Sequence, residues 1–266
     1  MTLKKMKAIR QRCVSVLVSF GLTACGLSAP AQENLGQVVF DDTFKINGPL
    51  KGYTTNNPEV VKVSAKDGRY FAPIYDNSNE KTLHFNQYQG RLDAQLISFP
   101  FTLIARNIGI GTLENSQEMP AIDGAPYIFA GVQVHTKALE ERNSAHVVVG
   151  HRGQTYNTVE GKHTVNGKSW VTDVGVNKAL HGRADLMIQG LPDKTLRVFW
   201  QPATTDSGPR TKDRWIAYAG HGKLPGESPV FTEEVYVGLI TYAFQDQGLP
   251  FVGTADQFQI FKPTQE

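Results

Sequence analysis

The segments Y-I-F-A-G-V-Q-V-H (residues 127–135) and S-A-H-V-V-V-G-H-R-G (residues 144–153) carry the strongest strand signal in the chain. In the first segment, Ile128 and Val132 belong to a set of apolar side chains at every second position, which places them on one face of a strand. Gln133 and His135 fall on the opposite face, beside Phe129. The pattern predicts two strands joined by a polar loop. One face of these strands is apolar, and the other carries aromatic, amide and imidazole groups. This arrangement is typical of a sheet that forms a binding groove.

Strand-like runs, separated by turns rich in Gly, Asn, Asp and Pro, recur through the rest of the chain, and almost no segment has a helical period. The predicted strands are Val38–Phe44, Val60–Ser64, Arg69–Ile74, Thr82–Asn86, Arg91–Phe99, Thr102–Ile110, Tyr127–His135, Ala145–His151, Arg183–Gln189, Thr195–Gln201, Arg214–Ala219, Val235–Phe244 and Gln257–Phe261. One helical turn at most is expected within Thr136–Asn143. The pattern predicts an all-β fold, a two-sheet antiparallel sandwich or a barrel, in one domain spanning residues 37–266. The two terminal strands are expected to pair and so protect an edge.

Residues 1–24 predict an export signal and no part of the fold. Five basic residues precede an apolar run that is too short for a permanent membrane span. The run ends in L-T-A-C-G, which resembles the bacterial lipobox, so Cys25 is the predicted lipidation site and residues 25–36 form a short tether. The alternative is an ordinary secretory signal cleaved after Ala29 or Ala31. Both interpretations predict that the protein is exported. The lipobox predicts a place in the cell envelope, and its following glycine favours the outer membrane of a Gram-negative bacterium.

The charge balance limits the partners that the protein can have. The chain has 27 Lys and Arg against 25 Asp and Glu, and residues 1–24 hold five of the basic residues and no acidic ones, which leaves 22 basic residues. This balance predicts no nucleic-acid partner, and membrane contact is expected only through the lipid on Cys25. Cys13 and Cys25 are the only cysteines, so the exported fold is predicted to contain no internal disulfide.

Several short motifs, taken in order, resemble those of one superfamily. They are V-F-D-D-x-F at 39–44, A-G-V-Q-V at 130–134, V-Y-V-G-L-I at 235–240 and D-Q-F-x-I at 256–260. Their order and spacing are similar to the concanavalin A-like lectin/glucanase superfamily, and within it to laminin-G-like jelly-roll domains. The resemblance implies two antiparallel sheets in a jelly roll. It also implies that the concave sheet faces a poly- or oligosaccharide.

A second, weaker resemblance concerns catalysis. The order of R-x-D-x-Q at 91–95, Q-x-H at 133–135 and a late tyrosine is similar to that of alginate-lyase-type polysaccharide lyases, although Asp93 and Gln95 stand where that family has Glu and a second Arg. The resemblance implies β-elimination on a uronate-containing polymer. Arg91 and Gln133 would neutralise the uronate carboxylate, His135 or Tyr242 would remove the adjacent proton, and the tyrosine would protonate the leaving oxygen. Each residue also has an ordinary interpretation, as a surface polar group or a packed tyrosine.

Other polar residues are predicted to contact a ligand. Asp93 and Gln95 share a face with Arg91 and could hold a sugar acid with it, or they form a cross-strand salt bridge on a solvated face. His146 and Arg152 have the parity to face the groove from the second strand of the central hairpin. Trp215 follows a polar loop and is the candidate aromatic platform for stacking against a sugar ring.

The sequence also bears on metal binding and on hydrolysis. No pattern typical of a zinc site is present, but Asp41, Asp42 and Asp256 come from terminal strands expected to be neighbours, and hard cations prefer such oxygens. They predict a structural calcium ion, or alternatively they are solvated turn carboxylates. Retaining hydrolysis is rejected because no strand carries the E-x-D-x-x-E or E-x-D-x-E pattern. The leading hypothesis is a glycan-binding envelope lipoprotein; a uronate lyase is the runner-up, and a structural protein of the envelope is a third possibility.

Overall fold

The computed structural model describes residues 35–75, 90–124, 126–153, 156–171, 175–203, 214–244 and 248–264. Within these ranges the chain forms two antiparallel sheets, here called sheet A and sheet B, so the predicted all-β, two-sheet antiparallel fold is confirmed. The predicted signal at 1–24, its lipidation site Cys25 and the predicted strand Thr82–Asn86 lie outside the described residues. Among the described residues, no helix is long and apolar enough to span a membrane.

Sheet A contains β1 (Gln37–Asp42), β3 (Ser64–Lys66), β4 (Arg69–Ile74), β6 (Phe101–Gly111), β11 (Arg183–Gly190), β12 (Leu196–Pro202), β13 (Ile216–Ala217), β15 (Phe251–Ala255) and β16 (Gln257–Lys262). Its order is β13-β12-β11-β6-β15-β4-β3, and β16 pairs with both β6 and β1. The pairing of β1 with β16 confirms that the two terminal strands are neighbours.

Sheet B contains β2 (Thr54–Asn56), β5 (Leu92–Ser98), β7 (Tyr127–Thr136), β8 (Ser144–Arg152), β9 (Tyr156–Val165), β10 (Lys168–Ser169) and β14 (Glu234–Phe244). Its order is β10-β9-β8-β7-β14-β5-β2. The predicted hairpin is therefore β7 and β8, at the middle of this sheet, and its connection contains the short 3-10 helix η3 (Leu139–Glu141). A second such helix, η4 (Tyr218–Gly220), follows β13.

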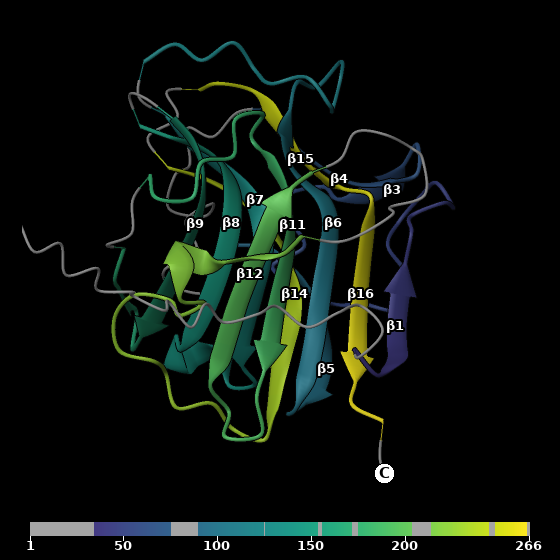
Figure 1. Cartoon of the computed structure of the whole chain (residues 1–266). Coiled ribbons are helices and arrows are strands. Elements are labelled where there is room, and N and C mark those ends of the chain that lie inside the picture. Colours follow the sequence, from purple (N-terminus) through teal and green to yellow (C-terminus); the bar gives the residue numbers. More distant parts are fainter. Residues whose placement is uncertain are drawn as a thin grey trace, which may run out of the picture.

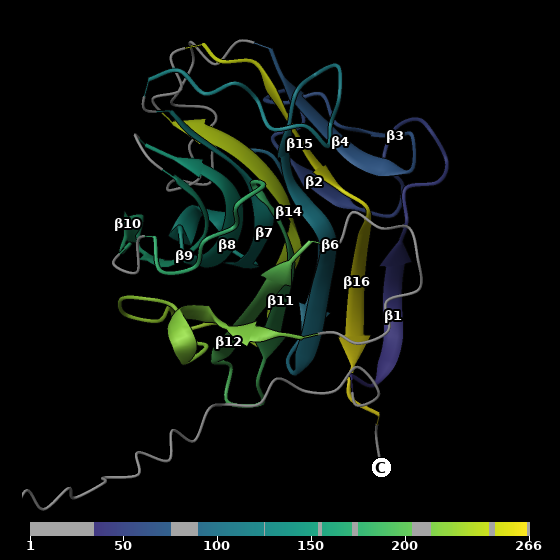
Figure 2. The same ribbon diagram turned by 45° about the horizontal axis from the view of Figure 1, so that its top comes forward.

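The two sheets lie face to face, with β12, β11, β6 and β16 in front of β8, β7 and β14 (Figure 1). Turning the molecule shows that the sheet B strands bend along their length (Figure 2). Apolar side chains from the two inner faces form the main core, among them Leu103, Leu186, Val132, Val147 and Leu239. Their removal from water supplies the main force that holds the sheets together, at roughly 25 cal/mol for each Å² buried.

Two of the predicted strands differ from the structure, one near β3 and one at β13, which lie at opposite ends of sheet A. The predicted strand Val60–Ser64 is wrong, because β3 begins only at Ser64. The carbonyl oxygens of Pro58 and Val61 accept hydrogen bonds from Nη1 of Arg91, at 3.1 and 2.9 Å, and this segment runs as an irregular connection. The predicted strand Arg214–Ala219 is reduced to the two residues of β13.

Candidate functional site

The outer face of sheet B, meaning the face that points away from sheet A, carries most of the candidate residues. The strand register shows which residues share it. On β7, Gln133 lies between Gly238 of β14 and His146 of β8. The row continues to Lys162 on β9 and to Ala94 on β5. Opposed residues in an antiparallel pair project to the same side of the sheet, so all five belong to the outer face.

Three aromatic rings gather around Gly131 in the middle of this face. Tyr242 lies opposite Phe129, with their ring centroids 5.4 Å apart, and the His146 ring is 5.6 Å from Tyr242 on the other side. The rings of Tyr242 and His146 come from strands on either side of β7 and meet across Gly131, which has no side chain there. A Cβ atom on Gly131 would lie 2.2 Å from the carbonyl oxygen of Val147, so this position requires glycine.

The side-chain amide of Gln133 is buried without a hydrogen-bond partner. Gln133 is 0 % exposed, and neither its Nε2 nor its Oε1 is hydrogen-bonded within the described part of the chain. The amide nitrogen of Asn56, at the β2 edge of the same sheet, is also without a partner there. A buried amide without a partner costs about 1–3 kcal/mol, so most proteins satisfy or avoid such groups. The unpaired amide of Gln133 therefore indicates a group that a ligand would satisfy.

His135 lies one row from Gln133 and is 2 % exposed. Its Nδ1 is 2.9 Å from the carbonyl oxygen of Thr136, which can only accept, so Nδ1 carries the proton of the neutral ring. Burial lowers the pKa of His135 below its ordinary value, and the Thr136 contact and the charges of Glu141 and Glu140 oppose this effect. The imidazole is therefore neutral at pH 7 and can act as a proton acceptor.

Tyr242, unlike His135, can act as a proton donor and not as a proton acceptor at neutral pH. Burial raises the pKa of Tyr242 well above its ordinary value, the nearby charge of Glu160 raises it further, and Arg152 opposes the effect. The hydroxyl stays protonated at neutral pH, so Tyr242 can donate a proton or a hydrogen bond but cannot serve as a base in this state.

Charged side chains occupy the β9 side of the outer face. Glu160 lies opposite Val148 and forms an ion pair with Arg152 of β8, and the guanidinium of Arg152 lies 5.2 Å from the Tyr127 ring. Burial raises the pKa of Glu160, while the charges of Arg152 and Lys162 lower it. Sequence reasoning missed Glu160 and Lys162 because it predicted no strand between His151 and Arg183, where β9 lies.

The arginine and acid of the 91–95 motif do not join this group, which corrects the predicted constellation. Asp93 lies opposite Leu239, whose side chain is in the main core, so Asp93 points between the sheets. It is 0 % exposed and accepts hydrogen bonds from Nη2 of Arg91 at 2.9 Å, from Thr55 at 2.7 Å and from Tyr70 at 3.0 Å. Gln95 has the same parity as Asp93, and its amide donates to the Gly52 carbonyl. These three residues face away from Gln133, His135 and Tyr242.

Trp215 is likewise remote from the outer face of sheet B. It packs in an apolar cluster with Ile104, Met187 and Phe199 on sheet A, and its ring lies 5.1 Å from the guanidinium of Arg106. The expected stacking platform is therefore on the wrong sheet to cooperate with Gln133.

The three aspartates predicted to bind calcium do not fit a shared metal site. Asp256 accepts hydrogen bonds from Nε of Arg69 and Nδ2 of Asn107, both at 2.9 Å. Asp42 accepts the Phe44 backbone N–H at 2.7 Å, and Asp41 accepts from Gln257 at 2.8 Å. Among the described residues, no group of three or more His, Cys, Asp or Glu side chains could hold a metal ion. Calcium therefore stays a prediction of the sequence without support from these contacts.

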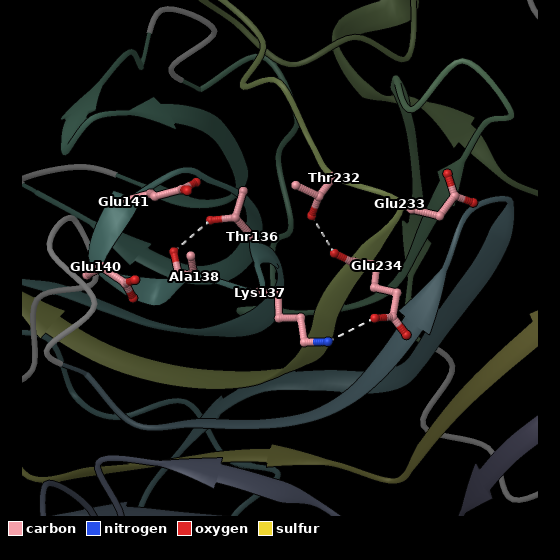
Figure 3. Close-up of a pocket in the computed structure, with 8 residues that line it drawn as sticks. All are labelled: Thr136, Lys137, Ala138, Glu140, Glu141, Thr232, Glu233 and Glu234. Carbon is pink, nitrogen blue, oxygen red and sulfur yellow. Dashed lines mark hydrogen bonds and ion pairs between the residues drawn. The ribbon is translucent and has the colours of Figure 1, made fainter.

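An acidic hollow of about 470 Å³ lies where β7 ends and β14 begins (Figure 3). Its lining residues are Thr136, Lys137, Ala138, Glu140, Glu141, Thr232, Glu233 and Glu234. Nζ of Lys137 lies 2.9 Å from Glu234, and the side chains of Glu140 and Glu141 stand on the opposite side of the hollow (Figure 3). The hollow is open to solvent, and its acidic side chains are largely hydrated, so it forms a rim beside His135.

Comparison with known proteins supports the fold. No protein-family model and no curated protein match the sequence. A GH43 protein from Bacillus licheniformis matches with 11 % identity over 86 % of this chain and a TM-score of 0.54. A xylan beta-1,4-xylosidase from Bacillus halodurans matches with 12 % identity over 84 % of this chain and a TM-score of 0.52. The chain spans only 39 % of the length of each of these proteins. The chain has the predicted concanavalin A-like jelly-roll fold.

Proposed function

We propose that the outer face of sheet B binds a poly- or oligosaccharide. The observation that carries this proposal is the amide of Gln133, which is fully buried and has no partner in the described chain. Saccharide hydroxyl groups both donate and accept hydrogen bonds, so one sugar unit can satisfy the two atoms of the amide at once. The rings of Tyr242 and Phe129, 3 % and 1 % exposed, lie on the same face beside it, and the C–H face of a sugar that reaches them can pack against such rings.

Replacing Gln133 with leucine separates this proposal from a purely structural role. Gln133→Leu removes a buried unpaired amide at nearly constant volume, so the free energy of unfolding should rise by about 1–2 kcal/mol. Affinity for a glycan should fall by about 10–100-fold, because the ligand loses both hydrogen bonds. Thermal or denaturant unfolding and calorimetric titration against a panel of neutral and acidic oligosaccharides measure the two effects.

Gln189→Leu is the matched control, because Gln189 is a half-buried glutamine of β11 on sheet A. It should leave glycan affinity unchanged. A wild-type protein that binds no member of a broad panel, or a Gln133→Leu variant that binds as well as wild type, contradicts the proposal. In the first case a structural role in the envelope becomes the better interpretation.

A second candidate activity is β-elimination on a uronate polymer, favoured by the contact between the Tyr242 and His146 rings. The neutral imidazole of His135 would take the proton next to the carboxylate. The electron pair left on carbon would form a carbon–carbon double bond as the bond to the leaving oxygen breaks, and the Tyr242 hydroxyl would protonate that oxygen. Gln133 alone would hold the carboxylate, because Arg91, its expected companion, faces away from it.

The lyase activity predicts an increase in ultraviolet absorbance from unsaturated uronates when the protein is mixed with a uronate polymer. Tyr242→Phe should lower that rate by about 10²–10⁴-fold, because the general acid is lost, while affinity changes little. Gln189→Leu again serves as the control with unchanged rate. A flat absorbance trace across uronate polymers that the protein demonstrably binds rules out catalysis and leaves glycan binding intact.

A further inference from the structure

A second buried amide group lies on the outer face of sheet B, at a distance from Gln133. Asn56 of β2 lies opposite Leu92 of β5, and Leu92 belongs to the apolar cluster of the outer face. Asn56 therefore projects to the same side of the sheet as Gln133. Its Nδ2 atom is buried and has no hydrogen-bond partner within the described part of the chain. The packing of β2 against β5 does not account for a buried donor at this position.

We infer that the outer face binds an extended saccharide chain of several units, which contacts Gln133 at one end and Asn56 at the other. This inference rests on the proposed glycan binding. The strand order places β14 and β5 between β7 and β2, so three strand spacings separate the two residues, which is about 14 Å. The two amides also lie one row apart along the strands, because Gln133 is in the row of Gly238 and Asn56 is in the row of Ile240. A single sugar unit is too small to contact both.

The part of the outer face between the two amides is apolar. Its positions on β14 and β5 are Gly238, Ile240, Ala94 and Leu92. None of these residues has a side chain that can form a hydrogen bond, so a ligand that crosses this stretch makes its side-chain hydrogen bonds at the two ends. A saccharide chain suits this arrangement, because its rings present C–H groups to an apolar surface and its oxygen atoms can accept hydrogen bonds from the amides.

The test measures affinity by calorimetric titration against glucan, xylan and uronate oligosaccharides, each supplied as the monosaccharide, disaccharide, tetrasaccharide and hexasaccharide. In at least one series, wild-type affinity should rise about tenfold at the length at which the chain reaches Asn56, because the buried Nδ2 atom gains a hydrogen bond. Asn56→Leu removes the amide, so it should lose this rise and keep wild-type affinity for the shorter members. Asn56→Asp keeps the shape and replaces the donor with an acceptor, so it should lose the rise as well. Gln189→Leu, on sheet A, should bind like wild type.

The double variant Gln133→Leu, Asn56→Leu adds an independent readout. Gln133→Leu should weaken the binding of short and long chains alike, whereas Asn56→Leu should weaken only that of long chains. Sites more than about 10 Å apart act nearly independently, so the loss of affinity for the long chain should equal the product of the two single losses to within about twofold. A double loss that departs from this product by much more would place both amides on the same sugar unit and overturn the inference.

The outcomes separate this inference from the function on which it rests. If wild type binds no member of any series, the proposed function fails. If it binds short and long chains equally, or if Asn56→Leu keeps the rise in affinity with length, the inference is overturned and glycan binding stands. A rise in only one series supports the inference and identifies the class of saccharide. If Asn56→Leu is unfolded by circular dichroism, Asn56→Asp decides, since a rise that persists in that variant also overturns the inference.

Discussion

Replacing Arg183 with methionine is expected to lower the free energy of unfolding by about 3–5 kcal/mol, which is a large share of the stability of a domain. Arg183 is 4 % exposed at the start of β11. Its guanidinium donates to Oδ1 of Asn107 at 2.9 Å, to the Ser116 carbonyl at 2.9 Å and to Oγ1 of Thr254 at 2.8 Å. It also donates to the carbonyl oxygens of Asn107 and Ile110. The variant removes all five of these hydrogen bonds, and most of them are buried.

Arg183 matters because it holds a β-bulge in the middle of sheet A. The register of β6 against β11 shifts between Ala184 and Leu186, and Asn107, in the bulge, has a φ of 46°. Burial lowers the pKa of Arg183 to about 10, so the guanidinium remains charged at neutral pH. The backbone carbonyl of Asn107, inside the bulge, accepts one of the hydrogen bonds of this guanidinium.

Denaturant unfolding of three variants tests this role. Arg183→Lys should be intermediate, because an ammonium group keeps the charge but cannot reach five acceptors in a fork geometry. Arg197→Met, a half-buried arginine of the neighbouring β12, should change stability by less than about 1 kcal/mol. An Arg183→Met protein as stable as Arg197→Met would show that the bulge does not depend on this guanidinium.

The sequence predicted the strands that have one apolar and one polar face, as in β7. It missed strands such as β9, whose two faces are both largely polar. For β7, the alternation of Ile128, Ala130, Val132 and Val134 with Gln133 and His135 predicted the strand to within one residue. In β9, the run T-V-E-G-K-H-T-V places Glu160 and Lys162 on one face but only Val159, Gly161 and His163 on the other, so its apolar signal is weak. The signal that could have predicted β9 is the alternation of its polar residues with Val159 and Val165. A strand prediction that requires a continuous apolar face does not detect it.

The sequence also did not predict which face of β5 points toward the other sheet. Period-two alternation correctly separated Arg91, Asp93 and Gln95 from Leu92 and Ala94, but it does not state which set faces the other sheet. The usual expectation places the apolar set inside. Here Leu92 and Ala94 join the cluster on the outer face, and Asp93 points into the sandwich. The reason is a partner that is distant in sequence: the Tyr70 hydroxyl comes from sheet A, and no local pattern reveals it.

Because Asp93 points between the sheets, replacing it is expected to lower stability without changing glycan affinity. Asp93→Asn should lower the free energy of unfolding by about 3–5 kcal/mol, because the amide cannot accept every hydrogen bond that the carboxylate accepts and the largely buried Arg91 loses its counter-charge. Burial and the charge of Asp93 raise the pKa of Tyr70 well above its ordinary value, so its hydroxyl remains a donor. The carboxylate thus ties β5 of sheet B to β4 of sheet A.

The same variant should bind glycan as wild type does at a temperature where it remains folded, since Asp93 faces away from Gln133. Asp67→Asn, at an exposed turn, should change neither property. In the double variant Arg91→Met, Asp93→Leu, the loss should be smaller than the sum of the single losses, because neither buried charge is left alone. Thermal unfolding and calorimetric titration of wild type, Asp93→Asn, Asp67→Asn, the double variant and its two single variants, Arg91→Met and Asp93→Leu, measure these effects. If Asp93→Asn kept its stability and lost glycan affinity, Asp93 would belong to the binding site after all, and the outer face would not be its only surface.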